Sequence, residues 1–114
     1  MSSTPDSARS DKLVSQLLLE DADLRDIVEE FVAGLDTRLN ELTAAHQQLD
    51  FQMLTTLAHR LKGAAGSYGY PEISSVCAEM EQKFKSNQDD NFAAFVTELA
   101  RFTDAAKAGL EVEV

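Results

Sequence analysis

Apolar residues recur along most of this chain at intervals of three and four, the spacing that places side chains on one face of an α-helix. The longest series predicts a helix from Asp23 to about Gln47, and Gly34 interrupts it, which indicates a bend or a close helix contact. Three further series predict helices from about Phe51 to Ser67, from Pro71 to about residue 85, and from about residue 92 to near Gly109.

Polar residues mark the ends of these predicted helices. Asp50 is placed to cap the second long helix, and Pro71 suits the first turn of the third, where its missing N–H would have no partner in any case. The stretch 86–90 predicts a turn that carries acidic cap candidates for the last helix. Ahead of all four, Asp11 is placed to cap a short helix that extends to about Leu19.

Short connections between amphipathic helices place consecutive helices antiparallel. Neither strand-like alternation nor an internal repeat competes with the helical pattern. The sequence therefore predicts an all-α fold, an antiparallel up-down-up-down four-helix bundle with a short extra N-terminal helix. The serine-rich residues 1–10 are expected to form a flexible leader, and residues 11–114 a single domain.

The apolar faces of the helices are expected to form the core. In the second long helix this face comprises Met53, Leu54, Leu57, Ala58, Leu61 and Ala65. Cys77 lies on the apolar face of the next helix and is expected to be a small core residue. The three leucines of the short N-terminal helix either cover the end of the bundle or form an exposed docking patch; they are Leu13, Leu17 and Leu18.

The charge of the chain narrows its choice of partners. Twenty acidic residues stand against ten basic ones, and the net charge is −10. Because binding to phosphate-rich surfaces relies on Lys and Arg, nucleic acid and anionic membranes are not expected partners. No apolar run is long enough to span a membrane. With a single cysteine and no signal-peptide pattern, the expected setting is the reducing cytoplasm.

One polar face of the second long helix carries the candidate chemistry. Residues three or four apart share a helix face, so His59 is grouped with Thr55, Lys62, Gly63 and Gly66. A glycine inside a helix costs about 0.8–1.0 kcal/mol relative to alanine. Two glycines so close to one histidine indicate that space is needed there, because a side chain would block a large object approaching the imidazole.

The segment Ala58-His59-x-Leu61-Lys62-Gly63, followed by small residues and Gly69, resembles the signature of the histidine-containing phosphotransfer (HPt) domain family. The resemblance extends through the Gly-x-Pro-Glu junction at residues 69–72, the helix that carries Ala78 to Glu81, and the last amphipathic helix. Members of this family act in bacterial-type multistep phosphorelays.

The resemblance implies that His59 takes a phosphoryl group from the aspartate of one receiver domain and passes it to another receiver. Glu81 would hold the second ring nitrogen, with Gln82 as the fallback, and Lys62 would stabilise the phosphoryl charge. Gly63 and Gly66 would clear the approach. The expected contacts at the rim of the site are Gln52, Thr55, Thr56 and Arg60.

The same resemblance implies a phosphocarrier rather than an enzyme, with no kinase or ATP site of its own. The sequence agrees, because it has no Gly-rich phosphate loop. No cofactor and no resident metal are expected, since the magnesium ion of such transfers comes with the receiver domain. The partners are receiver domains of response regulators and hybrid sensor kinases, and the chain is expected to be a monomer, because its apolar faces are used internally.

Other interpretations stay open at this point. The chain could be a helical interaction module that binds receiver domains without phosphorylation, or an enzyme that uses His59 as a general base or metal ligand. Gly63 and Gly66 could serve tight helix packing, and Glu81 could be a solvated helix carboxylate. His46 has no group of lysine and glycine residues near it like that of His59, and it is expected to be an ordinary surface residue.

Overall fold

The computed structural model describes residues 12–111, and every regular element within that range is helical. The leader 1–10 and the cap candidate Asp11 lie outside the described residues. The elements are α2 (Gln16–Glu20), the 3-10 helix η1 (Ala22–Leu24), α3 (Arg25–Ala33), α4 (Leu35–Gln47), α5 (Phe51–Ser67), α6 (Pro71–Lys85) and α7 (Phe92–Leu110). The prediction of an all-α fold is confirmed for these residues.

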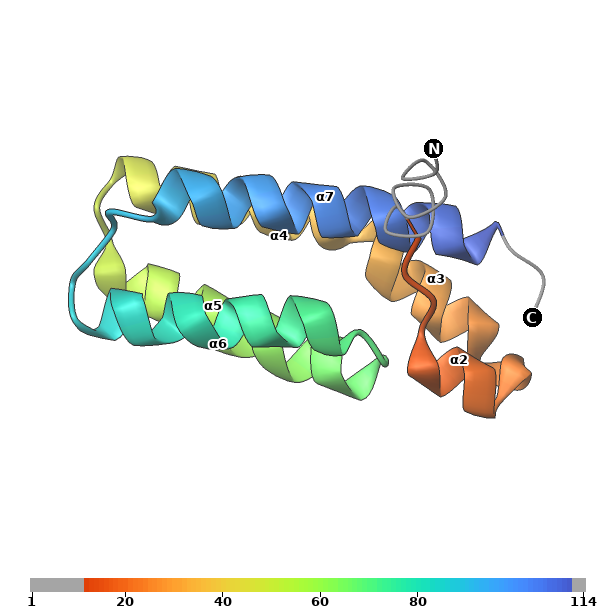
Figure 1. The fold of residues 1–114 in the computed structure, drawn as a ribbon. Helices are drawn as coiled ribbons and strands as arrows, with labels where there is room; N and C mark the ends of the chain where they lie inside the picture. The colour runs from red at the N-terminus through yellow and green to blue at the C-terminus, as the bar shows by residue number, and fades with distance from the viewer. Residues whose placement is uncertain (1–11, 112–114) are drawn as a thin grey trace, which may run out of the picture.

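Figure 1 shows α4 and α7 side by side in one layer, with α5 and α6 in a second layer beneath them. Helices α5 and α6 pack against each other along their length, while α3 and α2 lie at the end where α5 turns into α6. The bounds predicted for α5 and for the start of α6 are confirmed. Asp50 caps α5 as expected, with its Oδ1 accepting a hydrogen bond from the Met53 N–H at 3.0 Å.

The long helix expected over 23–47 is divided at Gly34 into α3 and α4. The Gly34 N–H still donates to the carbonyl oxygens of Glu30 (3.2 Å) and Phe31 (3.1 Å), so the break is a bend rather than an unfolded link. In Figure 1 α3 leaves the line of α4 at this point. This bend turns α3 across the end of the molecule.

The short N-terminal helix begins at Gln16, later than the sequence predicts. Its cap is Ser15, whose Oγ accepts from the Leu18 N–H (3.0 Å) and donates to the carbonyl oxygen of Tyr68 (2.6 Å). Residues 12–15 are not helical, because the Leu13 N–H donates to the Ala105 carbonyl oxygen of α7 (2.9 Å) instead of joining a helix. A contact so distant in sequence leaves no trace in local periodicity.

The leucines of this segment cover the end of the fold. Leu18 is buried, and Leu13 and Leu17 are half-buried against the core, so they do not form an exposed patch. A Cβ added at Gly109 would overlap with the carbonyl oxygen of Leu13, which explains a glycine where the segment crosses α7.

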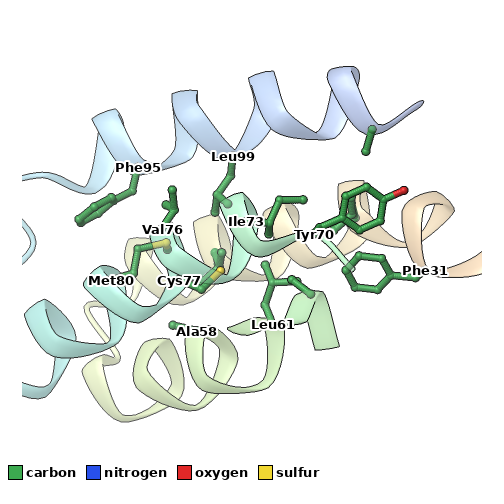
Figure 2. Packing of buried hydrophobic residues seen from close by; sticks show 14 of the residues in the cluster. Phe31, Ala58, Leu61, Tyr70, Ile73, Val76, Cys77, Met80, Phe95 and Leu99 are labelled. Atoms are coloured by element: carbon green, nitrogen blue, oxygen red, sulfur yellow. The ribbon is translucent and has the colours of Figure 1, made fainter. Parts of the chain in front are cut away.

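The core lies between the two layers, and Figure 2 shows part of it, including Ala58, Leu61, Cys77 and Leu99. Cys77 is fully buried as predicted, and burial raises the pKa of its thiol to about 12. Met53 departs from the prediction, since 45% of it is exposed. The fully buried line of α5 passes through Leu54, Ala58, Leu61 and Ala65, and Met53 lies beside that line at the groove between α4 and α5.

His46 is not the ordinary surface residue that the sequence predicts. Its ring stacks on Phe92 with a centroid separation of 3.8 Å, and its Nε2 lies 2.9 Å from Asp89 Oδ2. Asp89 therefore binds the end of α4 and does not cap α7, whose N-cap Asn91 makes no side-chain capping bond. The prediction of an acidic cap for the last helix is wrong, because the Asp89 carboxylate makes a tertiary contact with His46 instead.

Candidate functional site

The turn between α5 and α6 determines which residues of the two helices face each other. Gly69 has a φ of +89°, and a Cβ at that position would overlap with the backbone of α2. Glycine is the residue that adopts this conformation without steric cost. The Tyr70 N–H donates back to the Ala65 carbonyl oxygen at 2.8 Å, and Pro71 starts α6 at once. This tight reversal lays α6 along α5 and places Glu81 opposite His59.

His59 is exposed on the outer side of α5, with 65% of its side chain accessible to solvent. Its Nδ1 lies 3.0 Å from Oε2 of Glu81. The other ring nitrogen, Nε2, has no hydrogen-bond partner among the residues that the structure describes. One edge of the imidazole is therefore held by the protein, while the opposite edge faces solvent.

Glu81 is buried, with only 6% of its side chain exposed. It is therefore not the solvated helix carboxylate that was one of the two interpretations of the sequence. Its Oε1 lies 2.7 Å from Lys62 Nζ, and its Oε2 lies 3.5 Å from Lys85 Nζ as well as near His59. The close contact with Lys62, followed by the hydrogen bond from His59, lowers the pKa of the Glu81 carboxyl against the opposing effect of burial. The carboxylate is therefore ionised at neutral pH.

The charge of Glu81 selects the tautomer of His59. An ionised carboxylate can only accept hydrogen bonds, so Nδ1 must carry the proton in the 3.0 Å contact. In the neutral ring this leaves the lone pair on Nε2, the exposed nitrogen. The site thus presents the nucleophilic Nε2 of His59 to solvent. The buried Glu81 carboxylate lies where it can stabilise any positive charge that develops on the ring.

Replacing Glu81 by glutamine tests this charge arrangement through stability. The pKa of Glu81 in the folded chain lies below its ordinary value of 4.5, so the carboxylate stabilises the fold above pH 4.5 and loses this effect as pH falls through the lower folded-state value. We expect E81Q to lower the free energy of unfolding by about 1 kcal/mol at pH 7, because the partners are partly exposed and screened. The deficit should shrink below pH 4.5.

Urea unfolding of both proteins between pH 3 and 7 measures this difference. The matched control is Glu79→Gln, because Glu79 is an exposed carboxylate on the same helix. Equal stability of wild type and E81Q across the whole pH range would contradict the role given to the carboxylate.

The two glycines of the predicted face are open to solvent. A Cβ at Gly63 would meet nothing within 4 Å, and one at Gly66 would meet only Ser74 Oγ at 3.6 Å, an ordinary contact. Helix packing therefore does not require either glycine. Figure 1 shows α6 alongside α5 here, and the helices are joined by Ser74 Oγ, which donates to the Lys62 carbonyl oxygen at 3.0 Å.

The other predicted site residues lie at different places around His59. Gln52 and Arg60 are exposed, and Thr55 and Thr56 are half-buried, with Thr55 Oγ1 donating to the carbonyl oxygen of its own helix at Phe51 (2.8 Å). Arg60 lines a groove between α4 and α5, on the flank of α5 away from Glu81.

Two residues of α6 differ from the set of site residues that the sequence predicts. Gln82, the fallback for Glu81, lines a groove toward α7 and is not among the partners of His59. Sequence reasoning missed Lys85, which contacts Glu81 from one helical turn further along α6. The signal was present, since a Glu and a Lys four residues apart on a helix form a favourable pair.

Residues 12–111 contain no group of three or more His, Cys, Asp or Glu side chains arranged to hold a metal ion. None of the described helices is both long and apolar enough to cross a membrane.

Comparison with known proteins identifies the family of the chain. The family model described as Hpt domain matches residues 26–109, which is well over half of the chain and spans α4 to α6 in full with nearly all of α3 and α7. No curated protein and no solved structure gives a significant match. Domains of this family are phosphocarriers rather than enzymes, and they work with receiver domains. The chain therefore belongs to the Hpt domain family and is a component of phosphorelay signalling.

Proposed function

We propose that this chain is a histidine phosphocarrier that accepts a phosphoryl group on His59 from one receiver-domain aspartate and passes it to another. The observation that carries this proposal is the exposed imidazole whose Nδ1 is held by the buried carboxylate of Glu81 at 3.0 Å, which leaves Nε2 free. Lys62 stands beside the same carboxylate at 2.7 Å and adds positive charge to the site.

In the transfer step, the Nε2 lone pair of His59 attacks the phosphorus of the receiver's aspartyl phosphate. The N–P bond forms as the P–O bond to the aspartate breaks, and that electron pair leaves with the aspartate carboxylate. No proton has to move, because Nδ1 keeps its proton toward Glu81, and the ring becomes a cation paired with that anion. The onward transfer reverses these bond changes on a second receiver.

Lys62 contributes charge rather than a bond in this scheme. Phosphoryl transfer depends mainly on positioning and on electrostatic stabilisation of the phosphoryl oxygens, and a lysine supplies a compact positive charge. The open faces of Gly63 and Gly66 provide clearance for the receiver. The rim contacts proposed for the receiver are Gln52, Thr55, Thr56 and Arg60.

We expect Lys62→Ala to slow transfer about tenfold, because one charge-assisted contact to the phosphoryl group is lost, while the affinity for the receiver stays near that of wild type. Single-turnover transfer from a phosphorylated receiver measures the rate, and titration with the unphosphorylated receiver measures the affinity. Lys107→Ala is the control, since Lys107 pairs with Asp36, far along the chain from His59. An unchanged transfer rate would remove Lys62 from the mechanism.

The proposal also covers the setting of the chain. We infer that residues 11–114 are a single domain in which α4 to α7 form an antiparallel up-down-up-down bundle, and that the protein acts as a cytoplasmic monomer. The magnesium ion of the transfer is supplied by the receiver, and neither nucleic acid nor a membrane is a partner. The net charge of −10 supports the last point.

The direct test is incubation of the protein with a panel of phosphorylated receiver domains. Acid-labile label on the wild-type chain is the expected result, since phosphoramidate bonds are stable in base and hydrolyse in acid. Binding to receivers without any labelling would support the non-phosphorylated interaction module instead and would overturn the proposal.

A further inference from the structure

Two lysines and His59 meet one buried carboxylate, that of Glu81. Glu81 Oε1 contacts Lys62 Nζ at 2.7 Å, and Oε2 faces both His59 Nδ1 at 3.0 Å and Lys85 Nζ at 3.5 Å. Lys85 makes the longest of these contacts and is 54% exposed. Glu81 is its one ion-pair partner among residues 12–111.

The proposed transfer requires Lys62 to interact with two groups, the Glu81 carboxylate and the phosphoryl group on His59. In the resting site its ammonium group pairs with Glu81, which lies on the Nδ1 edge of the imidazole. The phosphoryl group would be bound at Nε2, on the opposite edge of the ring. Lys62 must therefore loosen its contact with the carboxylate in order to reach the phosphoryl oxygens.

Loosening that contact takes a cation away from a buried anion. A buried charge that loses its partner is strongly destabilised, because water cannot replace the lost interaction. Lys85 can make up this loss, since it already lies 3.5 Å from Oε2 and 54% of its side chain is exposed to solvent. The imidazolium formed by phosphorylation holds the same oxygen from the other side.

We propose that Lys85 is a positioning residue that neutralises Glu81 when Lys62 turns from the carboxylate to the phosphoryl group on His59. This inference rests on the proposed phosphocarrier function. Lys85 acts through Glu81 and Lys62 and does not touch the phosphoryl group itself. Its contribution therefore depends on the presence of Lys62.

The experiment is a double-mutant cycle measured by single-turnover transfer from a phosphorylated receiver that labels the wild-type chain. We expect Lys85→Gln to slow transfer about fivefold, the size of effect of one partly exposed ion pair. In the Lys62→Gln background the same substitution should cause no further slowing, because the lysine that Lys85 releases is absent. Lys85→Arg should restore most of the rate, since it keeps the charge.

Lys83→Gln is the matched control, because Lys83 lies on the same helix and pairs with Asp90 at 3.8 Å rather than with Glu81. It should transfer at the wild-type rate. If wild type is labelled and Lys85→Gln transfers as fast as Lys83→Gln, or slows transfer equally with and without Lys62, the inference is overturned and the phosphocarrier function stands. If no receiver labels wild type, both fall together.

Discussion

His59→Gln is expected to abolish phosphorylation and to leave the fold intact. The variant lacks the Nε2 lone pair, so no side-chain atom at this position can form the N–P bond. The histidine is largely exposed, and Lys62 and Lys85 still neutralise Glu81 in its absence. The free energy of unfolding should therefore change by no more than about 0.5 kcal/mol.

Labelling from a phosphorylated receiver, followed by acid treatment, checks this result, and urea unfolding checks the fold. His46→Gln is the informative control, because His46 is the other histidine of the chain. That variant should be labelled normally, but its free energy of unfolding should fall by about 1 kcal/mol, since the substitution breaks the stack on Phe92 and the contact with Asp89. Acid-labile label on His59→Gln would refute the assignment of the site.

Gly63→Gln is expected to slow transfer about a hundredfold without destabilising the protein. A side chain at this position meets nothing within 4 Å in the free molecule, so the fold tolerates it. Replacing an exposed helix glycine should even stabilise the fold by up to about 1 kcal/mol. The same side chain projects next to His59 and keeps the receiver from its productive position, and small misplacements of reacting groups reduce rates by about two orders of magnitude.

Single-turnover transfer and thermal unfolding measured on the same preparation separate the two effects. Gly63→Ala should lie between wild type and Gly63→Gln in rate, because its side chain is smaller. Ala100→Gln on the exposed side of α7 controls for adding a polar side chain to a helix surface. Transfer by Gly63→Gln at the wild-type rate would show that the glycines do not serve clearance.

Local physical chemistry was enough to predict the helices that hold the site. The bounds of α5 follow from the Asp50 cap and from the glycine turn at residue 69, and these signals act within a few residues of the helix ends. The apolar spacing predicted the buried face of α6, from Ile73 to Phe84. The offsets between His59, Lys62 and Gly63 identified the polar face and pointed to the family.

Tertiary structure decided what periodicity leaves open. The short helix begins at Gln16 with Ser15 as its cap, because Leu13 pairs with Ala105, more than ninety residues away along the chain. The Asp89 carboxylate pairs with His46 instead of capping α7. The pattern of residues within one helix cannot reveal such a contact between two elements.

The same holds for the centre of the site. Sequence places Glu81 on α6 and His59 on α5, but the distance between them depends on how the two helices pack after the turn at Gly69. Packing also buries the Glu81 carboxylate and brings Lys62, His59 and Lys85 to it. The contacts with Lys62 and His59 keep it ionised, and this charge sets the tautomer of His59. Residue identity along the chain thus determined which groups are available for chemistry. The packing of α5 on α6 decided their distances and burial, because these depend on contacts between residues far apart in sequence.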